Sequence, residues 1–194
     1  MTVPATQPPR VESRLDSRVE SRVDQRIDGR MLRNVCGLFV TGVTVITTGV
    51  NGRADGTTVN SFTSVSLDPP LVLFCLHKQS RLRSLLEESG MFAVNFLAGR
   101  QQRLAMAFAG KQTASFNEVA HHRAVGGVPI LSDALAFMAC TTVNEFDGGD
   151  HTIFLGEVRE LGVPRHNQEP LIFFRGSLGA LEHEPMIVPP IWDG

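Results

Sequence analysis

The chain has 194 residues, of which 42% are hydrophobic and 20% charged, and its formal net charge at pH 7 is -2. This length and apolar content predict a single domain with a sizeable core, and the nearly balanced charge argues against nucleic acid or an anionic membrane as a partner. No apolar run approaches the about 20 residues that span a bilayer, and the Arg-rich N-terminus lacks the apolar core of a secretory signal. The three cysteines, Cys36, Cys75 and Cys140, are predicted to be buried free thiols of a cytoplasmic protein.

The first 29 residues differ in composition from the rest of the chain. A four-residue unit recurs from Val11-Glu12-Ser13-Arg14 to Ile27-Asp28-Gly29-Arg30. Because an α-helix has about 3.6 residues per turn, the apolar positions of this repeat drift around it, and like charges face each other four residues apart. We therefore expect residues 1–29 to be a mostly disordered extension. A helix for oligomerisation or partner docking is the alternative.

The next elements follow from apolar spacing and turn chemistry. Helical spacing of apolar residues predicts a helix over residues 31–39, which Thr41-Gly42 would break. β-branched residues predict a strand over 43–50. Asn51-Gly52 is a strong hairpin signal, so residues 53–60 are expected to pair back antiparallel.

Residues 57–66, which we call the polar ledge, are dense in small hydroxyl and amide side chains. Such side chains compete for backbone hydrogen bonds, so the ledge is expected to leave the strand ladder and present donors into a cavity. Asp68-Pro69-Pro70 ends it, and the apolar run 71–76 is expected to be a buried strand. The ledge suits a flat polar ring, although an ordinary Ser/Thr-rich loop is the alternative.

The remaining chain alternates strand signals with short helices. Ser80 predicts the N-cap of a helix over 81–88 that Gly90 closes, and a strand over 91–97 and a helix over 101–108 follow. A polar, Gly-rich loop over 110–127 precedes two long strands, 135–146 and 152–161, and a last strand over 171–174. Many strands without a repeated βαβ pattern predict an antiparallel barrel. Residues 182–194 are expected to form a surface arm.

Motifs for several other chemistries are absent from the sequence. It has no nucleophile elbow, no phosphate-binding P-loop and no dinucleotide-binding glycine motif. The six histidines lack the spacing of a metal site, and His121-His122 are expected to be solvated rather than bound to a metal.

Four segments, in their order and spacing, resemble the short-chain flavin reductases, the reductase components of two-component flavin monooxygenases. They are residues 39–48, residues 60–71, Gly149-Asp150-His151 and Phe174-Arg175-Gly176. The resemblance covers about residues 31–181 and implies a mainly β protein of the FMN-binding split-barrel fold that forms a homodimer. It also implies a flavin reductase that takes a hydride from NADH or NADPH, reduces FMN or FAD and supplies a separate monooxygenase. That family binds nicotinamide directly over the flavin, so the missing dinucleotide motif does not argue against it.

The resemblance implies a place for the flavin ring. A flavin needs hydrogen bonds at its pyrimidine edge and an apolar wall at its other edge. The ring is expected on the polar ledge and against the end of the following strand, at Thr57, Thr58, Asn60, Ser61, Cys75, Leu76 and His77.

The flavin phosphate is expected at the next helix. Ser80 and Arg81 stand at a predicted helix N-terminus, where free amide groups and the helix dipole favour an anion. An ordinary N-cap beside a solvated arginine is the alternative. Gly110 and Lys111 match a second phosphate contact of the family.

His151 and Arg175 complete the expected site. The resemblance gives His151 a role in seating the nicotinamide, although a solvated turn histidine is the alternative. Hydride transfer needs mainly stacking and alignment, so His151 is expected to be a positioning group first and a proton relay second. Arg175 follows Phe173-Phe174, where the chain has no tyrosine, and its contact is left open. A flavin-binding protein without turnover, on the same barrel, is the alternative function.

Overall fold

The computed structural model describes residues 27–111, 116–164 and 167–181. Nearly all of the predicted N-terminal extension, and all of the predicted C-terminal arm, lie outside these residues. The chain divides into two compact units, Met1–Cys36 and Gly37–Gly194. In the first unit, α1 spans Gly29–Cys36, and the Met31 amide donates to Asp28 Oδ1 at 2.7 Å. The predicted helix was three residues too long at its C-terminal end, and Cys36 is exposed rather than buried.

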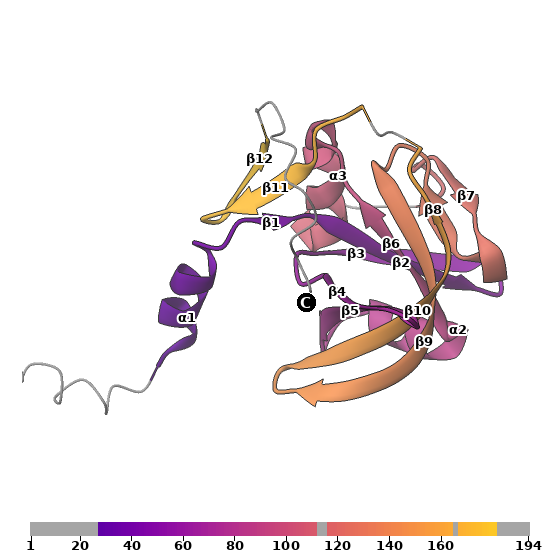
Figure 1. Cartoon of the computed structure of the whole chain (residues 1–194), viewed down its shortest axis with the longest axis horizontal. Coiled ribbons are helices and arrows are strands. Elements are labelled where there is room, and N and C mark those ends of the chain that lie inside the picture. The colour runs from indigo at the N-terminus through magenta and orange to yellow at the C-terminus, as the bar shows by residue number, and fades with distance from the viewer. Residues whose placement is uncertain (1–26, 112–115, 165–166, 182–194) are drawn as a thin grey trace, which may run out of the picture. The chain divides into compact units, whose positions relative to one another are not determined.

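One antiparallel sheet of seven strands dominates the second unit, in the order β3-β2-β6-β9-β10-β5-β4 (Figure 1). The two edge strands, β3 and β4, are consecutive in the chain and are separated by residues 60–62 alone. This short connection brings opposite edges of the sheet together, although the edges do not pair with each other. The result is an open barrel, which confirms the predicted mainly β split-barrel fold. The strands are β2 (Thr44–Val50), β3 (Arg53–Val59), β4 (Thr63–Leu67), β5 (Pro70–His77), β6 (Met91–Phe96), β9 (Ala136–Gly148) and β10 (His151–Gly162).

The polar ledge stays in the strand ladder more than expected. Thr57 and Thr58 lie in β3 and pair with Ile46 and Val45, while Thr63 begins β4. Only residues 60–62 lie outside a strand, so the prediction that the whole ledge leaves the ladder was wrong. β-branched threonine side chains fit a pleated strand, and this preference prevailed over their local hydrogen bonding.

Two small sheets accompany the barrel. β1 (Thr41–Gly42), β11 (Leu171–Phe174) and β12 (Ser177–Ala180) form one, and β7 (His121–Arg123) pairs with β8 (Pro129–Leu131) in the other. Thr41-Gly42 is therefore a strand that pairs with β11, not only a break. His121 and His122 lie in β7, not in a loop. Arg175 and Gly176, with φ values of 48° and 79°, turn the chain into β12, which the sequence analysis missed.

Short helices cover the ends of the barrel. α2 (Leu82–Ser89) begins one residue later than predicted, and its Leu82 amide donates to Ser80 Oγ at 3.3 Å. Gly90, with φ of 65°, ends it as predicted by donating to the Leu86 carbonyl. The predicted helix over 101–108 is three consecutive turns of different pitch: η2 (Gly99–Gln101), α3 (Gln102–Met106) and the π-helical η3 (Ala107–Lys111). One further turn, η4, spans Val125–Gly127.

Two buried clusters hold these parts in place. In the first, Phe74 stacks on Phe154 with ring centroids 5.3 Å apart and meets Phe92 edge-on at 4.9 Å. Leu82 and Leu86 join this cluster, so α2 is fixed to β5 and β10. The second cluster joins Val43, Val45, Leu97, Ala105, Phe108, Leu131, Ala134 and Leu171. It fixes α3, η3 and β11 beside the start of β2.

Candidate functional site

Two pockets lie along β3, and Ala109 of η3 lines both of them. The apolar pocket has a volume of about 230 Å³ and the polar pocket a volume of about 240 Å³. Since they share a wall residue and consecutive residues of β3, the two pockets adjoin each other. Together they form one candidate binding region.

The polar pocket brings together residues that are distant in sequence. Ser80 and Arg81 come from the start of α2, Thr57 from β3 and Gly110 from η3. The phosphate residues predicted from the sequence therefore meet at one place, except that the Lys111 side chain lies outside the described part of the chain. The complete lining is Asp55, Gly56, Thr57, Gln79, Ser80, Arg81, Leu82, Phe108, Ala109 and Gly110.

Two features of the polar pocket could not be read from sequence spacing. A Cβ added to Gly56 would lie 3.1 Å from Phe108 Cε1 and 3.0 Å from the Ile46 carbonyl oxygen, so glycine permits this close approach. Asp55 contributes a carboxylate whose Oδ1 accepts from the Gly56 amide at 2.7 Å. Arg81 thus has a negative neighbour in the same pocket, and the charge of the pocket is nearly balanced.

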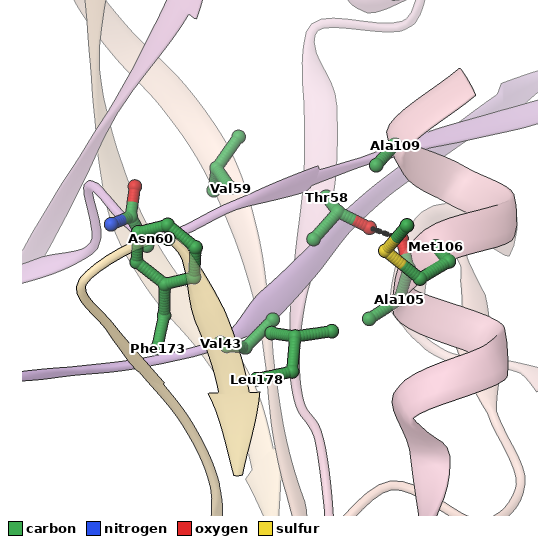
Figure 2. A pocket seen from close by; sticks show the side chains of 10 residues that line it. Val43, Thr58, Val59, Asn60, Ala105, Met106, Ala109, Phe173 and Leu178 are labelled. Atoms are coloured by element: carbon green, nitrogen blue, oxygen red, sulfur yellow. Dashed lines mark hydrogen bonds between the residues drawn. The ribbon is translucent and has the colours of Figure 1, made fainter. Parts of the chain in front are cut away.

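The apolar pocket lies between β3, α3 and the β11–β12 hairpin (Figure 2). Its walls include Met106, Phe173 and Leu178, and its polar side carries Thr58 and Asn60 of the polar ledge. The other lining residues are Val43, Val59, Ala105, Ala109 and Gly176.

The two ledge residues of this pocket differ in their hydrogen bonding. The Thr58 hydroxyl donates to the Ala105 carbonyl at 2.7 Å, and this bond joins β3 to α3 (Figure 2). The Asn60 amide group donates to Thr41 Oγ1 at 3.2 Å, and its side chain is exposed. Asn60 therefore retains an exposed carbonyl oxygen that a ligand can reach.

The other predicted ring contacts line neither pocket. Ser61 Oγ accepts from the Cys75 amide at 3.0 Å and donates to the Cys75 carbonyl at 3.2 Å. Its hydroxyl thus joins the 60–62 connection to β5. The Leu76 side chain is buried in the first core cluster, and its backbone pairs with Thr152 of β10. His77 is exposed at the end of β5.

His151 lies at the start of β10, directly opposite His77 of β5 in the sheet register. The two imidazole rings meet edge-on with centroids 5.2 Å apart. His151 Nδ1 lies 2.7 Å from Asp150 Oδ1, and this hydrogen bond holds the pKa of the Asp150 carboxyl below its ordinary value. The ring of His151 is therefore oriented by its neighbour at a partly exposed position.

The same end of the hairpin is tied to the residue that follows β5. The Lys78 amide donates to the Asp150 carbonyl at 3.0 Å, and the Lys78 ammonium pairs with Asp147. The bond to Lys78 holds the pKa of the Asp147 carboxyl below its ordinary value. From Lys78 the chain continues directly into Gln79, Ser80 and Arg81 of the polar pocket.

Arg175 lines neither pocket, although its neighbour Gly176 lines the apolar one. The Arg175 amide donates to the Gly37 carbonyl at 2.9 Å, and its guanidinium lies 5.1 Å from the centroid of the Phe174 ring. A cation over an aromatic face is a favourable contact, so the arginine side chain has a partner of its own.

Within residues 27–111, 116–164 and 167–181, no three His, Cys, Asp or Glu side chains gather as ligands for a metal ion. No helix in these ranges is long and apolar enough to cross a membrane.

The two pockets match different parts of one kind of molecule. The polar pocket offers Arg81 and the N-terminus of α2, which suit a phosphate. The apolar pocket offers an amide and apolar walls, which suit a heterocyclic ring. A flavin nucleotide has both parts, and its ring needs the combination of polar edge and apolar wall found here.

Comparisons with known proteins agree with this chemistry. Residues 36–182 match the model of the flavin reductase like domain. The chain is 40% identical over 156 residues to the reductase subunit HsaB of a flavin-dependent monooxygenase from Mycobacterium tuberculosis, which covers 80% of this chain and 83% of that protein.

Two solved structures show the same likeness in three dimensions. The flavin reductase PheA2 has 42% sequence identity and a TM-score of 0.75, over 81% of this chain and 100% of that one. The NADH:FAD oxidoreductase SgcE6 of Streptomyces globisporus, solved with NAD and FAD fragments, has 36% identity and a TM-score of 0.72, over 86% of this chain and 99% of that one. The chain therefore belongs to the flavin reductase-like family.

Proposed function

We propose that this protein is an NADH-dependent flavin reductase that reduces FMN or FAD and supplies the reduced flavin to a separate monooxygenase. The observation that carries the proposal is the adjoining pair of pockets along β3, one polar with Arg81 and one apolar with Asn60. Relatives named as NADH:FAD oxidoreductase and as the reductase subunit of a monooxygenase support the donor, the acceptor and the destination of the product.

Different residues of the site bind the flavin phosphate and the flavin ring. Ser80, Arg81 and the amide groups at the start of α2 hold the flavin phosphate, with Gly110 and Lys111 opposite them. The flavin ring lies on the polar ledge, where Asn60 accepts or donates at its pyrimidine edge and the apolar pocket receives its other edge. Hydride transfer from nicotinamide C4 to flavin N5 then requires stacking and alignment more than a strong acid or base.

His151 positions the nicotinamide. Ser61 bonds to Cys75, and His77, two residues further along β5, is the register partner of His151. The hairpin end that carries His151 thus lies beside the part of β5 that the ledge contacts through Ser61. Asp150 fixes the orientation of the imidazole, so His151 can offer one defined nitrogen toward the donor.

The protein is also proposed to be a homodimer. Large apolar side chains remain exposed on β4 and β9, among them Leu67 with 92% exposure and Phe146 with 47%. Apolar surface of this kind often marks a contact with another protein, and a second copy would cover it. The free thiols Cys75 and Cys140 fit a reducing compartment, which supports the cytoplasm as its location.

The test is a measurement of turnover with the full-length chain. NADH and FMN are mixed with the protein in the absence of oxygen, and the absorbance bands of the nicotinamide and the flavin are followed together. We expect both bands to fall in equal molar amounts at a rate that depends on the protein concentration. Quenching of flavin fluorescence without NADH oxidation would instead identify a flavin-binding protein that does not turn over.

A further inference from the structure

Arg83 of α2 connects the two ends of the proposed site. It lies two residues after Arg81, which lines the polar pocket, and its side chain reaches the hairpin that carries His151. Its Nη1 donates to Thr152 Oγ1 at 2.8 Å. Its Nη2 lies 3.8 Å from Glu145 Oε2 of β9, the other strand of the same hairpin. One guanidinium therefore contacts both strands.

The orientation of the Arg83 side chain is set from its own helix. Its Nε donates to Glu87 Oε1 at 2.7 Å, one turn further along α2. The side chain is 31% exposed, and its partner Thr152 is buried at 5%. A planar guanidinium with several donors suits such a three-way contact, whereas an ammonium group concentrates its donors at one point.

Thr152 is the residue directly after His151. Successive side chains of a strand point to opposite faces, so the tie to Thr152 holds the inner face of β10 and leaves His151 on the outer face. Lys78 holds the turn of the hairpin through Asp147 and the Asp150 carbonyl. The segment from Lys78 to Arg83 thus fixes the hairpin at two places and carries the phosphate residues Ser80 and Arg81 between them.

We propose that Arg83 is a positioning residue for the nicotinamide: through Thr152 it keeps His151 in register with the flavin, whose phosphate is held by the same segment. The proposal rests on the role proposed above for His151. Arg83 acts on alignment alone and lies outside the lining of both pockets. Removal of the Arg83 guanidinium is therefore expected to lower kcat/KM for NADH and to leave the affinity for flavin unchanged.

The first experiment uses Arg83→Met in the full-length chain, which removes the donors and keeps the length of the side chain. At saturating FMN we expect kcat/KM for NADH to fall about tenfold, since small misplacements of a positioning group lower the rate strongly. FMN affinity, measured by quenching of flavin fluorescence, is expected to stay within about twofold of the unmodified protein, because only transition-state alignment changes.

Two companion variants separate alignment from general stability. Thr152→Val removes the acceptor and keeps the volume of the side chain, so it should reproduce the fall in kcat/KM. Glu87→Gln removes only the charge and keeps an oxygen that accepts from Arg83 Nε, so the orientation of Arg83 is retained and the NADH kinetics should match those of the unmodified protein. An unchanged kcat/KM in both Arg83→Met and Thr152→Val would overturn the proposal.

A double-mutant cycle with His151→Ala identifies the route of the effect. If Arg83 acts through His151, Arg83→Met should change kcat/KM for NADH by less than about twofold in the His151→Ala background. Fully additive losses overturn the proposal for Arg83 alone, as does an equal loss of FMN affinity. Unmodified NADH kinetics in the single variant His151→Ala would instead overturn the role of His151 itself.

Discussion

At the scale of single residues, Arg81 should distinguish flavins that carry a phosphate from those that do not. Arg81→Ala removes one charge-assisted contact, which is worth about 1.5–3 kcal/mol in typical cases. We expect FMN to bind about tenfold or more weakly at that cost, while riboflavin binds as before. Fluorescence quenching with the two flavins measures both affinities.

The matched control is Arg159→Ala. Arg159 is an arginine of β10 that pairs with Glu157 at 2.8 Å and lines neither pocket. Its removal should change neither FMN nor riboflavin binding. Equal losses for FMN and riboflavin in Arg81→Ala would show that the phosphate lies elsewhere.

The cysteines give a prediction that is independent of the site. Burial raises the pKa of the Cys140 thiol from 9.0 to about 12, while Cys36 is exposed. The thiolate is the reactive form, so a disulfide reagent should modify Cys36 in the native protein and reach Cys140 only after unfolding. Thiol titration before and after denaturant measures this order. Rapid modification of Cys140 in the native protein would contradict its burial.

The same pKa has a consequence for stability. Burial penalises the thiolate, so the folded protein keeps Cys140 protonated at pH values where the unfolded chain ionises it. The free energy of unfolding therefore does not depend on this group below pH 9.0 and falls as the pH rises toward about 12. Cys140→Ala removes this pH dependence. The variant, although less stable from its lost volume, should lose less further stability than the unmodified protein between about pH 8 and about pH 10. Urea unfolding at both pH values provides the comparison.

Polar residues of the site were more predictable from sequence than apolar ones. Ser80, Arg81, Thr57 and Gly110 stand out because polar groups and glycines mark helix starts and turns, and the structure brings all four together. Met106 and Leu178 gave no such signal, because apolar residues produce the same sequence pattern whether they pack in a core or line a pocket. Recognising Leu178 also required β12, which follows a turn without the usual Asn-Gly pair.

At the scale of elements, the long β9–β10 hairpin depends on a glycine. A Cβ at Gly156 would lie 2.4 Å from Phe92 Cζ and 3.1 Å from Cys140 Cβ, and both of these residues are fully buried. Gly156→Ala should therefore overpack the core and destabilise the fold by about 1–3 kcal/mol. Urea unfolding at neutral pH measures the loss.

Gly179→Ala is the control for this substitution. Gly179 also lies in a strand, β12, but its added Cβ would find the Ile172 side chain at an ordinary 3.7 Å. Its unfolding midpoint should be close to that of the unmodified protein. Equal midpoints for the two alanine variants would mean that Phe92 yields easily and that the core tolerates the extra methyl group.

The elements also show where sequence reasoning succeeds. The strands at β2, β3, β5, β6, β9, β10 and β11 were all predicted, because β-branched runs and the Asn51-Gly52 turn are local signals. β1 was missed because its two residues are strand only through pairing with β11. β4 was read as a polar loop, since its outward-facing side chains lie on an edge strand where burial gives no alternating pattern.

At the scale of the whole molecule, the open edge of the barrel explains why the site lies where it does. The residues between β3 and β4 cross from one edge of the sheet to the other, and Ser61 joins them to β5. Phe62 of this crossing packs against the first core cluster, whereas Asn60 is exposed and remains available to a ligand. The same open edge leaves apolar side chains such as Leu67 exposed, which is the surface proposed for a second copy.

The last prediction concerns residues 1–26, which lie before the part of the chain that the structure describes and before the family match at residue 36. A protein that begins at Ile27 keeps Asp28, which accepts from the Met31 amide at the start of α1. We expect it to retain NADH-dependent flavin reduction and the sedimentation coefficient of the full-length protein, because both pockets and the exposed apolar side chains of β4 and β9 remain. Analytical ultracentrifugation of the two proteins at the same concentrations measures assembly. A full-length dimer that becomes a monomer on truncation would show that the repeat is an assembly helix, whereas a monomer in both cases would reject the dimer and leave the repeat without a role in assembly.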